Sequence, residues 1–376
     1  MKLTLPGRVA GLSLVAALAL TACGSDNTTG DATGSSAPAG SGSASSAGLS
    51  GTLNGEGSSA QKNAIQEVIS GYQGANSGVT VNYNPTGSGA GVKQFIAGQV
   101  DWAGSDSALK SEEKDGVVET DAAKQRCGGN DAWNLPMVAG PIAMTYNLPG
   151  VDRLVLTPSV ASQMYLGKIT KWNDPKIAAL NSGVTLPATD VKVFYRADES
   201  GTTENLAKYL NAAAPSDWAA EPAKVWPGKT GEGRPQTDGV ASGVKGAEGG
   251  FGYMEWSAAK DNQLGIAWVD NGGGAVQLTG ETAGKAVEAA QSAGTGNDLK
   301  LKLDYTVKDA GTYPIVLVTY QIVCSKGLAA DKTALLKSFL GYYASADTQK
   351  GLEEIGYAPL PESVRTKVVA AVDAIS

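Results

Sequence analysis

Three short segments rich in glycine and hydroxyl side chains each stand just before a stretch with helical spacing. They are residues 54–59 (NGEGSS), 85–91 (PTGSGAG) and 199–203 (ESGTT). Backbone N–H groups at the start of a helix point toward one spot, and the helix dipole adds positive potential there, so each segment suits an anion. One such segment alone is more often an ordinary helix cap. Three in one chain predict a single anion held from several sides.

The second of these segments does not fit the known nucleotide-binding motifs. Its glycines are not followed by the Lys-Ser/Thr pair of a Walker A loop, and GSGAG lacks the glycine spacing of a dinucleotide fingerprint. Nucleotide binding is therefore not expected.

Arg196 is well placed to help hold such an anion. It follows an expected strand over residues 191–195 and stands four residues before Ser200. A guanidinium donates two parallel hydrogen bonds to an oxyanion. The alternative is a surface arginine paired with Asp198.

Asp106 follows another expected strand, in the sequence GSDS. An aspartate at such a turn is usually an Asx-turn or a helix cap. Beside a bound anion it has a chemical use, because an ionised carboxylate only accepts hydrogen bonds and so favours a ligand oxygen that still carries a proton. Hydrogen phosphate carries that proton near neutral pH and sulfate does not. A buried acceptor of this kind rejects the analogue lacking the donor by ~10⁴-fold.

The composition excludes several classes of function. The chain contains no histidine, which excludes Ser-His-Asp and Cys-His triads and every metal site that needs imidazole. Its 30 basic and 37 acidic residues give a net charge of −7, so the basic surplus that nucleic-acid binding requires is missing. We expect no metal, no cofactor and no nucleic-acid partner.

The N-terminus predicts export. Residues 1–22 contain Lys2, Arg8 and an apolar run over residues 9–20, which is shorter than a membrane-spanning helix, so they are expected to be a signal peptide. The LTAC sequence that ends at Cys23 resembles a lipobox, which predicts a lipid anchor on the outer face of the cell membrane. The alternative is an ordinary secretory signal with a coincidental cysteine. Residues 23–48 would then be the lipidated cysteine and a flexible Gly/Ser/Ala tether.

The two remaining cysteines, Cys127 and Cys324, would lie in an oxidising compartment, where thiols tend to pair. We therefore predict a disulfide between them. The alternative is two unrelated buried thiols.

From residue 49 onward, short β-branched runs alternate with helical stretches, which predicts an α/β fold with a parallel sheet. Ligands of such folds bind where strands lead into helices. The expected strands are 51–53, 79–83, 101–104, 142–146, 191–195, 250–255, 265–269 and 313–323, and the expected helices are 60–76, 92–97, 159–166, 202–213, 332–344 and 362–374.

Six segments in order resemble the phosphate-binding lipoproteins (PstS family) of bacterial ABC phosphate importers. They are LNGEGSS, TGSGAGVKQFIAGQVDWAGSDSAL, NLPMVAGPIAMTYNLPGV, YLGKITKWNDPKIAALN, RADESGTT and GGFGYMEWSAA. The resemblance implies a class II periplasmic-binding-protein fold, in which two α/β lobes are joined by two hinge crossovers. We expect lobe I at 49–140 plus 312–376, which would contain both cysteines, and lobe II at 141–311.

The resemblance also implies how phosphate is held, by hydrogen bonds alone. Many family members have Thr-Phe where this chain has Ser59-Ala60, a change that keeps the hydroxyl and the main-chain donor. The implied ligands are the Ser59 hydroxyl, the Ala60 N–H, Ser88, Asp106, Arg196, Ser200, the Gly201 backbone and Thr202.

The sequence therefore predicts a monomeric phosphate receptor that serves a membrane permease and catalyses no reaction. A receptor for another tetrahedral oxyanion, such as sulfate or molybdate, is an alternative against which Asp106 argues. An exported phosphatase or serine hydrolase using Ser88 or Ser200 would lack an evident base. A purely structural surface antigen would bind no anion.

Overall fold

The structure is a computed structural model that describes residues 48–114 and 116–376. These residues belong to one compact unit. The predicted signal peptide, Cys23 and all but the last residue of the predicted tether lie outside the described residues. No helix in the described ranges has the length and apolar character needed to cross a bilayer.

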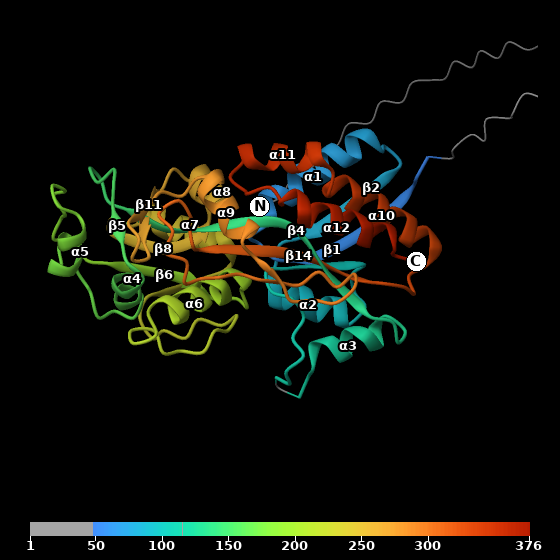
Figure 1. The fold of residues 1–376 in the computed structure, drawn as a ribbon, viewed down its shortest axis with the longest axis horizontal. Helices are drawn as coiled ribbons and strands as arrows, with labels where there is room; N and C mark the ends of the chain where they lie inside the picture. Colours follow the sequence, from blue (N-terminus) through green and yellow to red (C-terminus); the bar gives the residue numbers. More distant parts are fainter. Residues whose placement is uncertain (1–47, 115) are drawn as a thin grey trace, which may run out of the picture. The chain divides into compact units, whose positions relative to one another are not determined.

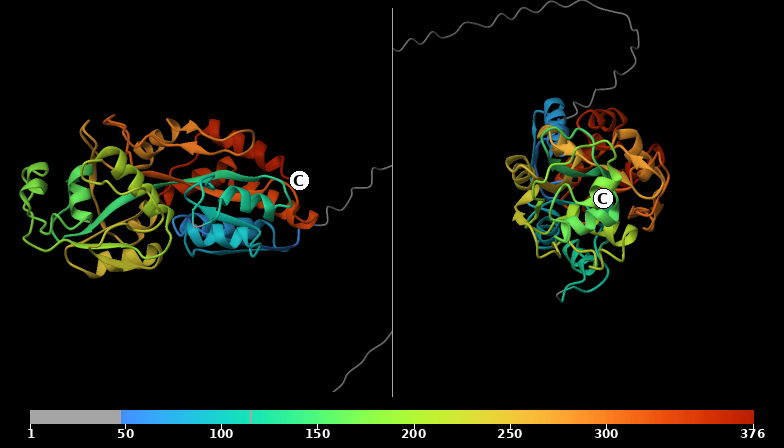
Figure 2. Two further views of the ribbon diagram at one scale, coloured as in Figure 1. Left: turned by 90° about the horizontal axis from the view of Figure 1, so that it is seen from below. Right: turned by 90° about the vertical axis from the view of Figure 1, so that its left-hand side faces the viewer.

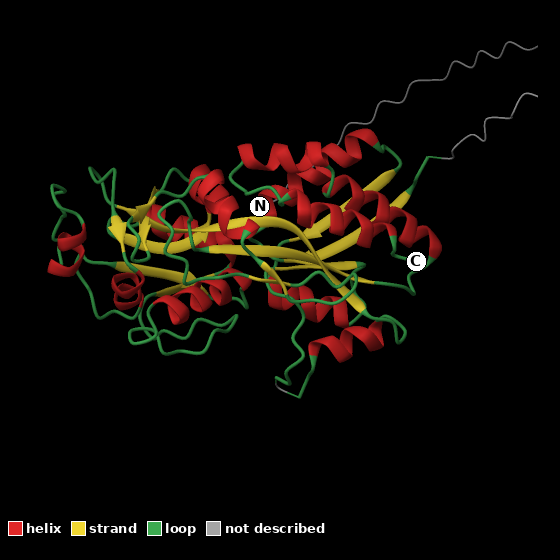
Figure 3. Cartoon of the chain, in the orientation of Figure 1, coloured by secondary structure: helices red, strands yellow, loops and turns green. Residues whose placement is uncertain are grey.

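The main sheet has nine strands in the order β2-β1-β3-β14-β4-β8-β6-β7, with β9 paired to β4 (Figures 1 and 3). Parallel pairing joins β1 to β2 and β3, and joins β6 to β7 and β8. The strands are β1 (Gly51–Gly57), β2 (Val79–Asn84), β3 (Trp102–Ser105), β4 (Ala132–Asn147), β6 (Lys192–Arg196), β7 (Glu232–Arg234), β8 (Gly250–Glu255), β9 (Gly265–Ile266) and β14 (Val316–Cys324).

The centre of the sheet is antiparallel, so the expectation of a parallel sheet is wrong there. Strand β14 pairs antiparallel with both β3 and β4, and β4 pairs antiparallel with β8. Because β4 and β14 are buried along almost their whole length, their sequences are apolar runs without alternation. Strand β4 begins ten residues before the expected strand, and its register with β14 shifts between Thr319 and Tyr320.

Helices cover both halves of this sheet. Helices α1, α2 and α10 contact the β1–β3 part and α7 contacts β6 and β8, while β4 runs from one part to the other (Figures 1 and 2). The helices are α1 (Lys62–Ala75), α2 (Ser88–Ile96), α3 (Glu119–Arg126), α4 (Pro158–Tyr165), α5 (Pro175–Leu180), α6 (Gly201–Ala213), α7 (Gln236–Gly246), α8 (Trp256–Asp261), α9 (Gly280–Glu288), α10 (Ala330–Tyr343), α11 (Ala346–Glu354) and α12 (Glu362–Asp373).

Two small sheets complete the fold. One has the order β11-β10-β5 and the other pairs β12 with β13. Their strands are β5 (Val155–Leu156), β10 (Trp268–Asp270), β11 (Ala275–Val276), β12 (Gln291–Ser292) and β13 (Leu301–Lys302). The expected strand over 265–269 is therefore divided between β9 and β10.

Most of the predicted helices appear within a few residues of their expected ends, but one difference matters for the site. Helix α2 begins at Ser88, four residues before the expected start. Gly87, with φ of 109°, precedes it in a conformation that favours glycine. The second glycine-rich segment therefore supplies the first turn of a helix, which is where backbone N–H groups have no partner within the helix.

The buried apolar side chains form three clusters. The largest gathers mainly residues between 139 and 317, the second joins β1 and α1 to α10 and α12, and the third lies around α2 and β3. The third cluster contains Cys127 and Cys324, which form the predicted disulfide with their Cα atoms 5.4 Å apart.

Candidate functional site

The segments that follow β1, β3 and β6 meet the first turn of α2. A side chain added at Gly201 would lie 2.6 Å from both Asp106 Oδ2 and Ser88 Oγ, so only glycine permits this approach. The Gly89 N–H donates to the Glu199 carbonyl at 3.0 Å, which joins the second and third glycine-rich segments. The structure thus brings together and buries all the predicted ligand residues, Ser59, Ala60, Ser88, Asp106, Arg196, Ser200, Gly201 and Thr202.

Asp106 is surrounded by hydroxyl groups. Ser58 and Thr319 donate to its Oδ1 at 2.6 and 2.7 Å, and Ser88 donates to its Oδ2 at 2.9 Å. Neither Ser58 nor Thr319 was predicted. The N–H of Ala60, an expected ligand donor, instead donates to Ser58 Oγ at 3.0 Å. Three of about four lone-pair positions on the carboxylate are filled in this way, which leaves one acceptor position free.

Arg196 ends β6 and is held from two sides. Its Nε donates to Asp198 Oδ1 at 2.8 Å, and its Nη2 donates to Asp198 Oδ2. Its Nη1 donates to Thr237 Oγ1 at 3.4 Å. The pair with Asp198 that the sequence left open as an alternative therefore exists, but the arginine is 2% exposed and is not a surface residue.

Helix α6 presents its first turn to the same site. Ser200 is its N-cap, with its hydroxyl accepting from the Thr203 N–H at 3.2 Å, so this predicted ligand also acts as a cap. The N–H groups of Gly201 and Thr202 stand in the first turn, where the helix itself provides no acceptor. Together with the dipole of a 13-residue helix, they make this end attractive to an anion.

Glu255 is a buried carboxylate that the sequence analysis missed. It ends β8, is 1% exposed, and its Oε1 lies 2.5 Å from the Thr202 hydroxyl. Its Oε2 accepts from Thr237 Oγ1 at 2.9 Å, and that hydroxyl lies 3.0 Å from Ser59 Oγ. The only available signal was a charged residue ending an apolar strand in GYMEW. Thr237 lies in α7, a helix that was not predicted at all.

Burial dominates the electrostatics of the two carboxylates. It raises the pKa of Asp106, and the hydrogen bonds from Ser58, Thr319 and Ser88 oppose the rise only in part. Burial likewise raises the pKa of Glu255, against the opposing charge of Arg196. Burial lowers the pKa of the Arg196 guanidinium, but its hydrogen bond to Asp198 and the charge of that partner outweigh burial and raise it. The arginine is therefore the fixed positive charge of the site.

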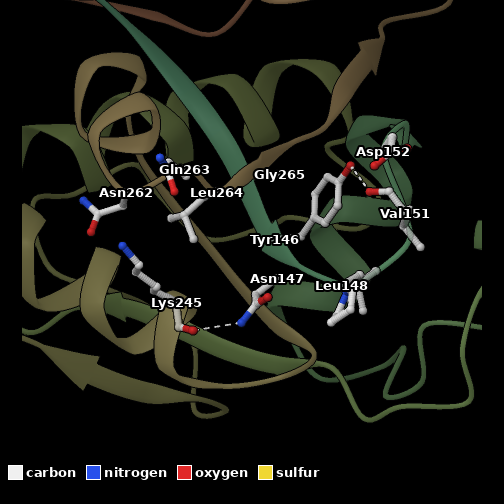
Figure 4. A pocket seen from close by; sticks show the side chains of 11 residues that line it. Tyr146, Asn147, Leu148, Val151, Asp152, Lys245, Asn262, Gln263, Leu264 and Gly265 are labelled. Atoms are coloured by element: carbon white, nitrogen blue, oxygen red, sulfur yellow. Dashed lines mark hydrogen bonds between the residues drawn. The ribbon is translucent and has the colours of Figure 1, made fainter.

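Two pockets in the part of the chain that the structure describes differ in their relation to this site. A pocket of about 860 Å³ includes Asp106 in its lining, together with Lys110, Lys208 and Lys300. A separate pocket of about 490 Å³ is lined by residues such as Tyr146, Lys245 and Gln263 and by none of the predicted ligands (Figure 4). Within the described ranges, no group of three or more Asp, Glu or Cys residues is arranged to hold a metal ion.

Comparisons with known proteins agree with this arrangement. Residues 42–347 match the family described as PBP superfamily domain. Phosphate-binding protein PstS 3 of Mycobacterium tuberculosis (strain ATCC 25618 / H37Rv) is 40% identical over 381 residues, covering 100% of both chains. Phosphate-binding protein PstS of Pasteurella multocida is 30% identical over 302 residues, covering 78% of this chain and 82% of that protein. A solved periplasmic phosphate-binding protein, PfluDING, bound with phosphate, has a TM-score of 0.70 at 20% identity, covering 85% of this chain and 93% of that chain.

Proposed function

This chain belongs to the PstS family of phosphate-binding proteins, and we propose on that premise that it is a receptor for inorganic phosphate. It has the two-lobed α/β fold of the PBP superfamily. Phosphate would bind between the lobes and be delivered to a membrane permease of an ABC importer.

The arrangement around Asp106 is the observation that carries this proposal. Its carboxylate is 3% exposed and accepts three hydroxyl hydrogen bonds, so one acceptor position is left for a ligand. Hydrogen phosphate has a P–O–H group to donate there, whereas sulfate would place a lone pair against a lone pair. This position therefore favours phosphate over sulfate and molybdate.

Arg196 and the first turn of α6 supply donors for the other phosphate oxygens. Ser88 and the Ala60 N–H donate to Asp106 and Ser58 in this structure, so they would have to turn from these acceptors to the ligand. We propose as ligands the eight residues that the family resemblance implies, with Arg196 as the charged donor and Gly201 and Thr202 as main-chain donors. Hydrogen bonds to charged groups contribute about 1.5–3 kcal/mol each. About six of them suffice for micromolar affinity, roughly −8 kcal/mol, after the cost of closing the lobes.

The lobe boundaries belong to the same proposal. Lobe I would comprise residues 49–140 and 312–376, and lobe II residues 141–311. The chain would then cross between the lobes within β4 and just before β14, and β14 pairs along its length with residues 132–141 of β4. Such paired crossovers allow the lobes to close by a bend in few residues.

The cellular setting follows from the N-terminal sequence and the family. We propose that the protein is a monomer, anchored by a lipid on Cys23 to the outer face of the cell membrane, where it captures phosphate for the permease. It would bind its ligand without metal, cofactor or catalysis. A phosphatase using Ser88 or Ser200 would reveal itself by releasing phosphate from an ester, and the receptor would not.

Isothermal titration of the protein, freed of copurified anion, with phosphate and then sulfate at neutral pH tests this function. We expect micromolar or tighter phosphate binding and no sulfate binding. In Asp106→Asn the amide can donate as well as accept, so the preference, ~10⁴-fold in the parent, should fall by at least tenfold. A folded protein that binds no phosphate would refute the proposal.

A further inference from the structure

Glu255 contacts one of the proposed phosphate ligands, Thr202, directly and a second, Ser59, through Thr237. It touches Thr202 Oγ1 through Oε1, and through Oε2 it touches Thr237 Oγ1, which in turn touches Ser59 Oγ. It is not among the eight residues proposed to touch the ligand. Its contacts nevertheless determine what those hydroxyls can donate, because a hydroxyl has one proton and two lone pairs.

The first contact concerns Thr202. When Glu255 is ionised, its Oε1 can only accept a hydrogen bond. Thr202 Oγ1 lies 2.5 Å from this oxygen, so the Thr202 hydroxyl must donate its single proton to Glu255. The hydroxyl then has only lone pairs to present to an anion, which repels them. When Oε1 carries a proton, it donates to Thr202, and the Thr202 proton is free for a phosphate oxygen.

The second contact extends the same logic to Ser59. Thr237 Oγ1 accepts from Arg196 Nη1, so with Glu255 ionised it gives its proton to Oε2 and accepts the proton of Ser59. Ser59 Oγ also accepts from the Thr237 N–H at 3.3 Å and retains no proton for a ligand. A proton on Oε2 reverses this chain, because Thr237 then donates to Ser59 and frees the Ser59 proton.

The charged groups facing Glu255 come from several elements. Arg196 of β6 favours the ionised form, whereas Asp106, after β3, and burial at the end of β8 favour the neutral form. Tyr357, in the segment between α11 and α12, also faces the carboxylate: burial raises the pKa of its phenol, and the charge of Glu255 adds to this rise. Burial is the largest of these influences and raises the pKa of Glu255. A dianion bound next to Arg196 would add a further charge against the ionised form.

We propose that Glu255 is a positioning residue that takes up a proton when phosphate binds, and that this proton frees one hydroxyl donor, Thr202 or Ser59, for the ligand. The proton comes from solvent and resides on Oε1 or Oε2, and no covalent bond to phosphate is formed. This inference rests on the proposed function, since it concerns how the phosphate site is set for its ligand.

Proton counting by titration calorimetry tests the inference. Phosphate is titrated into the parent protein and into Glu255→Gln in buffers of different ionisation enthalpy, at several values between about pH 5 and about pH 8. Because ligand and pH are the same for both proteins, the ionisation of phosphate itself cancels in the difference. We expect the parent to take up more protons than the variant, with a difference that increases with pH toward about one.

Affinity measurements provide a second readout. A glutamine amide has a permanent N–H donor and a carbonyl acceptor, so it imitates the protonated acid, and Glu255→Gln should bind phosphate within about threefold of the parent at neutral pH. Glu255→Leu can neither hold a hydroxyl proton nor take up a proton itself, so its proton count on phosphate binding should equal that of Glu255→Gln. If Glu255→Leu does not fold, the proton count of Glu255→Gln still decides the question.

Glu204→Gln is the matched control for the proton count, because Glu204 is also buried but is paired with lysines and does not contact Thr202 or Ser59. Its proton count should equal that of the parent. Equal counts in the parent and Glu255→Gln, with both binding phosphate, would overturn the inference and leave the receptor function intact. A parent that binds no phosphate would instead refute the function on which the inference rests.

Discussion

Asp106 and Glu204 are equally buried, 3% and 2% exposed, but different donors surround them. Hydroxyl groups of Ser58, Ser88 and Thr319 hold Asp106. Lys110 Nζ and Lys208 Nζ lie 3.0 and 3.1 Å from Glu204 Oε1, and one hydroxyl donates to Oε2 at 2.9 Å. Burial raises the pKa of both carboxyls. For Glu204, the charges of Lys208, Lys110 and Lys224 outweigh burial and lower the pKa to about 2.

The difference shows two uses of a buried carboxylate. Lysines fix the charge of Glu204, which ties the segment after β3 to α6 through Lys110 and Ser107. Neutral hydroxyls hold Asp106 in position without neutralising its charge, and they leave one acceptor position of the carboxylate for a ligand. Only the second kind of environment suits a site that must distinguish ligands by their protons.

Removing the lysine-held charge should produce the largest effect on stability. The pKa of Glu204 falls from the ordinary 4.5 to about 2 in the folded protein, which corresponds to about 3 kcal/mol of unfolding free energy. Glu204→Gln removes this stabilisation. A carboxyl with a lowered pKa stabilises the fold above its ordinary pKa and loses this contribution as pH falls. Urea unfolding should therefore separate parent and variant at neutral pH but not near pH 2.

An exposed ion pair provides the control for this prediction. Glu281 pairs with Lys285 at 3.1 Å, but its side chain is 79% exposed. Glu281→Gln should cost less than about 0.5 kcal/mol, because solvent screens such pairs. If Glu204→Gln cost no more than this control, the two buried environments would not differ as we describe.

Removing the charge of Asp106, which hydroxyl groups hold, should have the opposite effect on stability. The raised pKa of Asp106 means that the fold gains stability as the group protonates and loses it as pH rises through the folded-state pKa. Asp106→Asn removes a buried charge while keeping an acceptor. Its unfolding free energy at neutral pH should therefore equal that of the parent or exceed it by up to about 1 kcal/mol. Thermal melts in phosphate-free buffer measure this. A loss above 1 kcal/mol would mean that the ionised carboxylate is itself stabilising.

We expect the smallest effect on stability from removing one of the lysines beside Glu204. Lys208 is the i,i+4 partner of Glu204, and the Lys208 side chain is 36% exposed. Lys208→Met removes this partner and leaves Lys110 in place. The unfolding free energy should fall by about 0.5 kcal/mol in low salt and be nearly unchanged in about 1 M salt. A loss that persists in high salt would indicate packing by the lysine stem instead of its charge.

Much of the site was predictable because it consists of local signals. The glycine-rich segments, Arg196 after its strand and Asp106 at a turn are each visible within a few residues, and the structure brings them together. Ser58, Thr237, Thr319 and Glu255 were missed because their importance lies in contacts between distant segments. The Asp106–Thr319 hydrogen bond, for example, joins residues 213 positions apart.

The fold shows the same limit. Alternating short strands and helices correctly predicted the α/β class and every strand of the main sheet except β7, but only six of the twelve helices in the described residues. They could not predict that β4 and β14 pair antiparallel in the middle of the sheet, because both strands are buried on two faces and have no alternation to indicate direction or partner. The disulfide was predictable from the number of cysteines and the inferred compartment.

The position of β14 also determines the order in which the molecule can be assembled. This strand separates β3 from β4 in the sheet, yet it is formed by residues 316–324 of 376, so the ribosome must make most of the chain before the central strand exists. Until then, the inner edges of β3 and β4 are unpaired and resemble aggregation-prone edge strands. Segments of this chain should therefore depend on protection by chaperones during synthesis and reach their final pairing only near completion.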